Sequence, residues 1–216
     1  MKAKVLSYGG EAATVSYDLK RCIHAAECVH GLPQVFDPKR KPWVLPDEAS
    51  PDELLQVVTA CPTGALHVER KDGGGGEATP SKNTARIEAD GPVYVLGDIE
   101  IAGAGDESIL HDTRVAFCRC GASENKPLCD GAHAKAGFRD PGELPSSEGD
   151  SGEQTGGMRF TPIPNGPLLF AGPLELTSSA GEARTLSVKG ALCRCGASQN
   201  NPYCDGAHAE AGFLAD

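Results

Sequence analysis

The segment Cys118-Arg-Cys-Gly-Ala-Ser-Glu-Asn-Lys-Pro-Leu-Cys-Asp-Gly-Ala-His133 returns 75 residues later as Cys193-Arg-Cys-Gly-Ala-Ser-Gln-Asn-Asn-Pro-Tyr-Cys-Asp-Gly-Ala-His208. Continued to Phe138 and Phe213, the two copies are identical at 17 of 21 positions, which chance does not produce. Upstream the similarity continues without a gap to Gly91 and Gly166. The chain therefore holds a tandem repeat over 91–138 and 166–213, and we expect its halves to pair because neither buries much surface alone.

Each copy places four metal-binding side chains within 16 residues. The last cysteine and the histidine are four residues apart and so share one face of a helical turn, while the Cys-x-Cys pair comes from an extended loop. Asp130 or Asp205, directly after the last cysteine, is placed to cap that turn. The candidate ligands are Cys118, Cys120, Cys129 and His133 in the first copy and Cys193, Cys195, Cys204 and His208 in the second.

This motif resembles the CDGSH iron–sulfur family, whose pattern is Cys-x-Cys, a Ser or Thr, Pro-x-Cys-Asp-Gly, a small residue and His. Both copies match, with Ala132 and Ala207 as the small residue. The resemblance implies a [2Fe–2S] cluster held by three cysteines and one histidine in each copy, with the histidine on the iron nearer solvent. It also implies a two-fold arrangement of two modules, which a monomeric tandem chain could build within itself as an intramolecular pseudo-dimer.

Zinc is the alternative occupant, because a Cys₃His set also suits a structural zinc ion. Zinc sites usually separate paired cysteines by about two to four residues, however, and here a single arginine intervenes. We expect these arginines, Arg119 and Arg194, to be surface charges that offset a negative cluster, without a catalytic role. A neutral imidazole in place of a thiolate predicts a reduction potential above that of a plant-type ferredoxin and a dependence on pH.

Three further cysteines precede the repeats, at Cys22, Cys28 and Cys61, the last followed by proline. A bacterial ferredoxin would run Cys-x₂-Cys-x₂-Cys before a distant Cys-Pro, so Ala25 occupies the place of the second ligand. The segments Cys22-Ile-His-Ala-Ala-Glu-Cys28 and Cys61-Pro-Thr-Gly-Ala-Leu66 resemble the divergent single-cluster ferredoxins, over about residues 17–70. That resemblance implies a [3Fe–4S] or [4Fe–4S] cluster and a role in electron transfer.

The sequence leaves two possibilities for the leader cluster, with three or with four protein ligands. Three thiolates suffice for a [3Fe–4S] cluster, whereas a [4Fe–4S] cluster needs a fourth ligand. His24 is the nearest candidate, although it lies one residue before the vacant position. A disulfide between Cys22 and Cys28 in an apo form is the other alternative, and it would leave Cys61 unexplained.

Local sequence signals predict which elements position Cys61. Ser50-Pro51-Asp52-Glu53 is a capping-box pattern with proline at the first helical position, so a helix should begin there and carry the chain to Cys61. Pro62 should end that helix, and Leu66-His-Val68 should form a strand.

The composition favours small modules over one large core. Leu, Ile, Val and Phe supply only 42 of the 216 residues, while Gly and Pro supply 43. We therefore predict an α+β protein: a small ferredoxin-like domain at 1–71, a glycine-rich linker at 72–86, a β-rich CDGSH module at 87–140, a second linker at 141–157 and a second module at 158–216.

Composition also limits the functional classes. Nine cysteines without a signal-peptide pattern or a membrane-length apolar run predict a cytoplasmic protein that binds metal and does not enter membranes. The net charge of −10 lies wholly in residues 72–216, which argues against nucleic acid as a partner and favours basic docking proteins.

Function is expected to follow from the clusters alone. The sequence shows no nucleotide-binding loop or nucleophile elbow, so we expect a non-enzymatic electron carrier that exchanges electrons with a separate reductase and acceptor. The alternative is a redox or pH sensor, or a cluster donor. A third role for the clusters, stabilising the fold of a chain with a small core, is compatible with either function.

Overall fold

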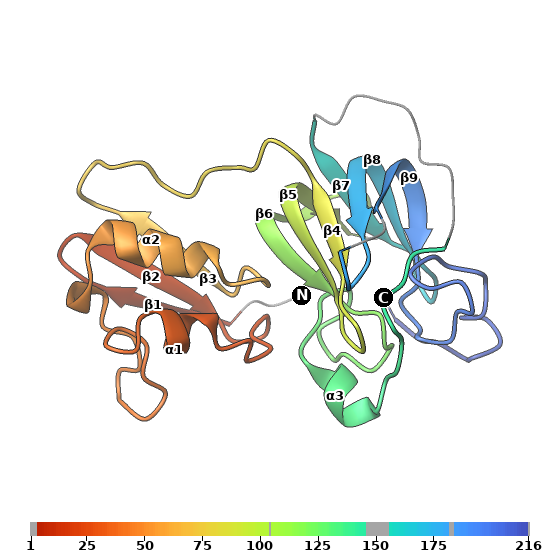
Figure 1. Cartoon of the computed structure of the whole chain (residues 1–216), viewed down its shortest axis with the longest axis horizontal. Helices are drawn as coiled ribbons and strands as arrows, with labels where there is room; N and C mark the ends of the chain where they lie inside the picture. Colours follow the sequence, from red (N-terminus) through yellow and green to blue (C-terminus); the bar gives the residue numbers. More distant parts are fainter. Residues whose placement is uncertain (1–3, 104, 146–155, 182–183, 216) are drawn as a thin grey trace. The chain divides into compact units, whose positions relative to one another are not determined.

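The computed structural model describes residues 4–103, 105–145, 156–181 and 184–215, and the chain divides into two units between Ala78 and Thr79 (Figure 1). The division falls inside the glycine-rich segment 72–86. Each unit has its own cluster of buried apolar side chains. Among the described residues, no helix combines the length and the apolar character that crossing a membrane requires.

The first unit is a three-stranded antiparallel sheet with short helices. Strand β2 lies in the middle of the sheet and pairs with β1 and β3 on its two sides. Helix α2 covers one face of this sheet through Leu54 and Val58, which are buried in the same core as Val15 and Val68 (Figure 1). The elements are β1 (Val5–Gly9), β2 (Ala13–Asp18), α1 (Glu27–Gly31), the 3₁₀ turn η1 (Pro46–Glu48), α2 (Pro51–Thr59) and β3 (Leu66–Arg70).

The capping box predicted at Ser50 is present. The backbone N–H of Glu53 donates to Ser50 Oγ at 3.3 Å, and the backbone N–H of Ser50 donates to Glu53 Oε2 at 2.8 Å. These two bonds satisfy donors that a helix start otherwise leaves open. Helix α2 ends at Thr59, two residues before Cys61, and the predicted strand follows at Leu66, so both local predictions are confirmed.

The second unit contains both repeats in one hydrogen-bonded sheet of mixed direction. The first repeat supplies β4, β5, β6 and α3, and the second supplies β7, β8 and β9. The loops that follow β6 and β9 lie at the same end of the sheet (Figure 1). The elements are β4 (Thr84–Ile87), β5 (Val93–Ala102), β6 (Ser108–Phe117), α3 (Ala132–Ala136), β7 (Met158–Pro162), β8 (Leu168–Thr177) and β9 (Arg184–Leu192).

Strands β4 and β7 each pair with the next strand of their own repeat and also with a strand of the other repeat. Strand β4 of the first repeat pairs in parallel with β8 of the second, and β7 of the second repeat pairs in parallel with β5 of the first. Phe117 of one repeat and Phe160 and Phe170 of the other pack in one shared core. The two repeats therefore bury their apolar faces together, as expected for units that are too small to do so alone.

Each repeat contains one long strand that runs through a glycine. Strands β5 and β8 continue through Gly97 and Gly172, where the register with the neighbouring strand shifts. Gly97 has φ 157°, and Asn83 Oδ1 accepts a hydrogen bond from the N–H of Asp98 at 2.9 Å. The glycines therefore form bulges inside a continuous strand and do not end it.

Part of the segment expected as the second linker is ordered. The N–H of Ser179 donates to the carbonyl of Gly142 at 2.8 Å, and Ser179 Oγ donates to the carbonyl of Pro141 at 2.7 Å. Leu144 packs against the shared core. The rest of that expected linker, 146–155, lies outside the described residues.

Candidate metal sites

All eight ligands predicted in the repeats gather at two equivalent places, and within each place they form two close pairs. In the first repeat, Cys118 Sγ lies 3.6 Å from Cys120 Sγ, and Cys129 Sγ lies 3.4 Å from His133 Nδ1. The second repeat gives the same two distances, 3.6 Å for Cys193 with Cys195 and 3.4 Å for Cys204 with His208. Among the described residues, no group of three such side chains converges on a point suited to one metal ion.

The aspartate after the last cysteine holds each ligand loop closed. Asp130 Oδ1 accepts the N–H of Ala132 at 3.0 Å, and its Oδ2 accepts the N–H of Glu124 at 2.8 Å. Asp205 makes the equivalent bonds with Ala207 and Gln199 at the same distances. The aspartates hold the turn before the histidine as expected, but the N-cap residue of α3 is Gly131, so Asp130 lies one residue before the cap position. The second oxygen adds a hydrogen bond across the loop that the sequence alone did not indicate.

Backbone N–H groups point at the cysteine sulfurs. Ala122 donates to Cys120 Sγ at 3.4 Å, Gly131 to Cys129 Sγ at 3.4 Å and Ala197 to Cys195 Sγ at 3.5 Å. Such bonds stabilise negative charge on sulfur and adjust the potential of a cluster. The donor set thus fits a group bound through thiolates.

Burial disfavours the thiolate form of the repeat cysteines when no cation is bound. It raises the pKa of the Cys129 thiol to about 12. A hydrogen bond to Cys120, together with burial, raises the pKa of Cys118, and the same bond lowers the pKa of Cys120. Cys118 and Cys129 lose their protons readily only when bound cations supply countercharge, so the site is suited to ligation.

The arginines between the paired cysteines are not surface charges, so that expectation is wrong. Arg119 and Arg194 are only 1% and 2% exposed. Arg119 Nε donates to the carbonyl of Gly91 at 2.9 Å, and Arg194 Nε donates to that of Gly166 at 2.9 Å. Each guanidinium also holds the carbonyl three residues before that glycine. The arginines therefore tie the Cys-x-Cys segment to the turn before the long strand, through contacts 28 residues away that local patterns do not reveal.

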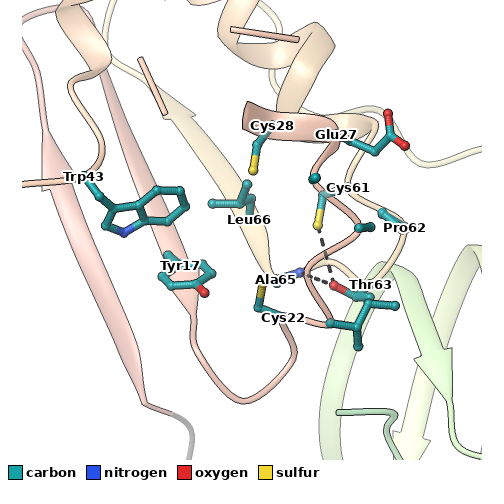
Figure 2. Close-up of a pocket in the computed structure, with 13 residues that line it drawn as sticks. Tyr17, Cys22, Glu27, Cys28, Trp43, Cys61, Pro62, Thr63, Ala65 and Leu66 are labelled. Carbon is teal, nitrogen blue, oxygen red and sulfur yellow. Dashed lines mark hydrogen bonds between the residues drawn. The ribbon is translucent and has the colours of Figure 1, made fainter. Parts of the chain in front are cut away.

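In the first unit, Cys22, Cys28 and Cys61 line one pocket (Figure 2). Cys22 follows β2, Cys28 lies on α1 and Cys61 follows α2. Burial and the neighbouring Cys61 raise the pKa of the Cys28 thiol to about 11. Figure 2 shows Tyr17 and Trp43 on one side of this pocket, where their rings pack edge to face with centroids 4.9 Å apart.

The vacant ligand position faces the three cysteines. Ala25 lines their pocket, whereas His24 lines an adjoining cavity that Cys22 and Cys28 also line and Cys61 does not. His24 and Ala26 both have left-handed backbone angles, with φ 61° and 66°, and this double turn directs Ala25 inward. All nine cysteines are free thiols, so Cys22 and Cys28 do not form the alternative disulfide.

Arg21 is a site residue that sequence reasoning missed. It is 6% exposed, and its Nε and Nη2 donate to the carbonyl of Thr63 at 3.1 and 2.6 Å. Arg21 thereby fixes the turn after Cys61 beside Cys22. The one feature of the sequence that could have indicated this role is that Arg21 lies next to a cysteine, as Arg119 and Arg194 also do.

Comparisons with known proteins agree with this geometry. Residues 8–71 match the family described as a divergent 4Fe-4S mono-cluster, and residues 90–134 and 165–209 match the family described as the iron-binding zinc finger of CDGSH type. The chain therefore contains a divergent mono-cluster iron–sulfur domain followed by a tandem pair of CDGSH domains.

Two curated relatives were found for part of this iron–sulfur protein. They are the uncharacterized protein YjdI of Escherichia coli K12 and its namesake in Escherichia coli O157:H7. Each is 39% identical over 64 residues, which is 30% of this chain and 84% of the relative. No solved structure matches the chain.

Proposed function

We propose that this protein is a non-enzymatic electron carrier with three clusters. Each CDGSH repeat would hold a [2Fe–2S] cluster on three cysteines and one histidine, and the leader unit would hold a [3Fe–4S] or [4Fe–4S] cluster on Cys22, Cys28 and Cys61. When bound, such clusters supply one-electron redox chemistry. The protein supplies the ligands, buries them and directs backbone N–H groups at the sulfurs.

The arrangement of ligands in pairs is the observation that carries the proposal. A dinuclear cluster takes two protein ligands on each iron, and each repeat offers two close pairs, Cys118 with Cys120 and Cys129 with His133. A zinc ion would draw all four ligands to within about 2.0–2.3 Å of a single point. Among the described residues, no three of these side chains converge on one point, and a single residue separates the first two cysteines; both observations favour the cluster over zinc.

The leader site supports a cluster with one position that no cysteine fills. Three thiols and Ala25 line its pocket, which favours [3Fe–4S]. A [4Fe–4S] cluster in the same place would leave one iron for water or an external ligand, since His24 is not among the residues that line the pocket of all three cysteines.

The reciprocal pairing of β4 with β8 and of β7 with β5 supports an intramolecular pseudo-dimer, because the equivalent strand of each repeat pairs with the other repeat. We infer that a monomer is sufficient for both CDGSH sites. The excess of acidic residues in 72–216 suits basic docking surfaces on a reductase and an acceptor, and it disfavours nucleic acid.

A cluster donor or pH sensor is the second candidate, and the exposure of the histidines favours it. His133 and His208 are half-buried, while Cys118 and Cys193 are buried. An accessible imidazole can take a proton and release its iron. Transfer of the cluster absorbance to an apo-ferredoxin would support the donor, whereas repeated redox cycles without loss of iron would support the carrier.

The deciding experiment is an anaerobic count of iron, zinc and acid-labile sulfide per chain. About seven irons are expected with a [3Fe–4S] leader cluster and about eight with [4Fe–4S]. A Cys22→Ser/Cys28→Ser/Cys61→Ser variant is the matched control and should retain about four, all in the repeats. Stoichiometric zinc with little sulfide would overturn the cluster assignment.

A further inference from the structure

The hydroxyl of Thr63 lies beside a cysteine of the leader site. Thr63 comes two residues after Cys61, and its side chain lines the pocket of the three cysteines (Figure 2). Its Oγ1 lies 3.5 Å from Cys61 Sγ, within hydrogen-bond distance for sulfur, and the residue is only 3% exposed. A hydroxyl buried to this extent depends on protein atoms for its hydrogen bonds.

A second hydrogen bond determines the direction in which this hydroxyl points. The backbone N–H of Ala65 donates to Thr63 Oγ1 at 3.2 Å, and Figure 2 shows this bond together with the contact to Cys61. The oxygen is thus an acceptor toward Ala65, and its own proton is available for the sulfur. A free thiol can donate to the oxygen, but a thiolate that binds iron has no proton and only accepts. Ligation therefore makes Thr63 the donor to Cys61.

The backbone of Thr63 is held in place by a separate set of bonds. Its carbonyl accepts two hydrogen bonds from Arg21, at 3.1 Å from Nε and 2.6 Å from Nη2. The N–H of Gly64 donates to the carbonyl of Cys61 at 3.4 Å and closes the turn. Because the carbonyl and the hydroxyl of Thr63 are both fixed, the donor is already oriented toward the sulfur before any ligand binds.

A hydroxyl directed at a ligating sulfur favours the reduced state of a cluster. Reduction adds one negative charge to the cluster and its thiolates, and a donor proton stabilises the more negative state more strongly. Thr63, Gly64 and Ala65 are all buried, so water screens this interaction only weakly.

We propose that Thr63 sets the potential of the leader cluster: its hydroxyl donates to the Cys61 thiolate and raises the reduction potential. Thr63 acts through Cys61 and does not itself bind iron, so it is a positioning residue. Reduction takes one electron from an external reductant and converts one ferric ion to ferrous, while the proton stays on Thr63 Oγ1. The inference rests on the proposed cluster at Cys22, Cys28 and Cys61.

The test compares Thr63→Val, which keeps the shape of the side chain and removes the hydroxyl, with Thr63→Ser, which keeps the hydroxyl. The full chain is titrated anaerobically with dithionite and followed by electron paramagnetic resonance. A [3Fe–4S] leader cluster is read from its oxidised-state resonance, and a [4Fe–4S] cluster from the reduced-state resonance that Cys22→Ser/Cys28→Ser/Cys61→Ser lacks. At any one potential, the reduced-to-oxidised ratio of this cluster should be about fivefold lower in Thr63→Val than in the parent, and unchanged in Thr63→Ser.

Thr59→Val is the matched control, because it removes a hydroxyl from the same unit two residues before Cys61. Thr59 Oγ1 lies 2.8 Å from the carbonyl oxygen of Leu55 and 3.0 Å from that of Gln56, so its hydroxyl bonds to the backbone of α2. This variant should leave the potential of the leader cluster unchanged. Equal potentials in Thr63→Val and the parent, or the same shift in Thr59→Val, would overturn the proposal.

Thr63→Ala is a second variant without the hydroxyl, for use if valine prevents loading of the leader cluster. If neither variant holds the cluster while Thr63→Ser does, Thr63 serves only to hold the site, and the proposal is refuted. The iron and sulfide count separates the two levels. Parent chains without a leader cluster refute the proposed function, whereas loaded chains whose potential does not respond to loss of the hydroxyl refute this inference alone.

Discussion

The backbones of Cys120 and Cys195 pair directly, so the second cysteines of the two Cys-x-Cys segments meet at the junction of the repeats. Each is followed by a glycine with a left-handed backbone, Gly121 with φ 76° and Gly196 with φ 79°. A Cβ on Gly121 would lie 2.6 Å from the carbonyl oxygen of Cys195. Because this neighbour is main chain, it cannot rotate away, and a shift at one site must move the other.

Gly121→Ala should therefore loosen both CDGSH sites together. The left-handed backbone costs an alanine about 1 kcal/mol, and the contact with Cys195 adds on the order of 1–3 kcal/mol of overpacking. We expect the thermal midpoint of bleaching to fall by about 2–4 °C for each kcal/mol. The measurement is the visible absorbance of both clusters during heating.

Gly212→Ala is the control for this variant. Gly212 also has a left-handed backbone, with φ 63°, but a Cβ there would meet nothing within 4 Å. It should lower the midpoint by the backbone cost alone. If the two variants are equally destabilised, the close approach of the Cys-x-Cys segments has no energetic consequence.

The elements that the sequence predicted correctly are those encoded by neighbouring residues. The capping box at Ser50 predicted α2, and the Asp-Gly step predicted the turn held by Asp130. The strand pairing between the repeats was not predictable, because β4 and β8 pair across about 90 residues without a local signal. The burial of Arg119 was missed for the same reason, since its carbonyl partners lie at Glu88 and Gly91.

His133→Cys and His208→Cys should make the repeat clusters harder to reduce and more resistant to acid. A thiolate adds negative charge, and the imidazole that could take a proton is gone. Burial lowers the pKa of His133, so its neutral, ligating form is favoured at and above the usual imidazole range and is lost only as the pH falls below it. Bleaching of the parent at the His133 site should begin in that lower range.

Absorbance of the parent, the two single variants and the double variant, recorded during acidification, provides the measurement. Each single variant should protect only its own cluster, which makes one repeat the control for the other. If the double variant bleaches at the same pH as the parent, the histidines are not the acid-sensitive ligands.

Ser50→Ala should destabilise the leader unit by about 1 kcal/mol, the usual cost of losing a helix N-cap. Hydrogen bonds from Ser50 lower the pKa of Glu53, so this stabilisation is present above the ordinary glutamate pKa and is lost as the pH falls. The difference from the parent should therefore shrink between neutral pH and about pH 4. Trp43, the single tryptophan, reports this unit by its fluorescence.

Ser50→Thr keeps the capping oxygen and should behave like the parent at both pH values. If Ser50→Ala lowers the free energy of unfolding by the same amount at both pH values, Glu53 does not take part in the cap.

Ala25→Cys should favour a [4Fe–4S] cluster in the leader unit. Ala25 lines the pocket of Cys22, Cys28 and Cys61, so a thiol there completes a Cys-x₂-Cys-x₂-Cys loop of the kind that binds a four-iron cluster. In the parent, an oxidised [3Fe–4S] cluster has an odd electron count and is paramagnetic, while oxidised [2Fe–2S] clusters are silent. Electron paramagnetic resonance of the oxidised protein thus isolates the leader signal.

The variant should lose this oxidised-state resonance and gain one on reduction, with the repeat clusters unchanged. Ala25→Ser, which is similar in size but a much weaker iron ligand, should keep the parent spectrum. A parent that is silent when oxidised, with all its iron retained, would mean that the leader cluster already has four irons. His24→Ala would then decide the fourth ligand: because His24 lies on the adjoining cavity, we expect this variant to retain its four irons, and loss of one iron would assign the imidazole as that ligand.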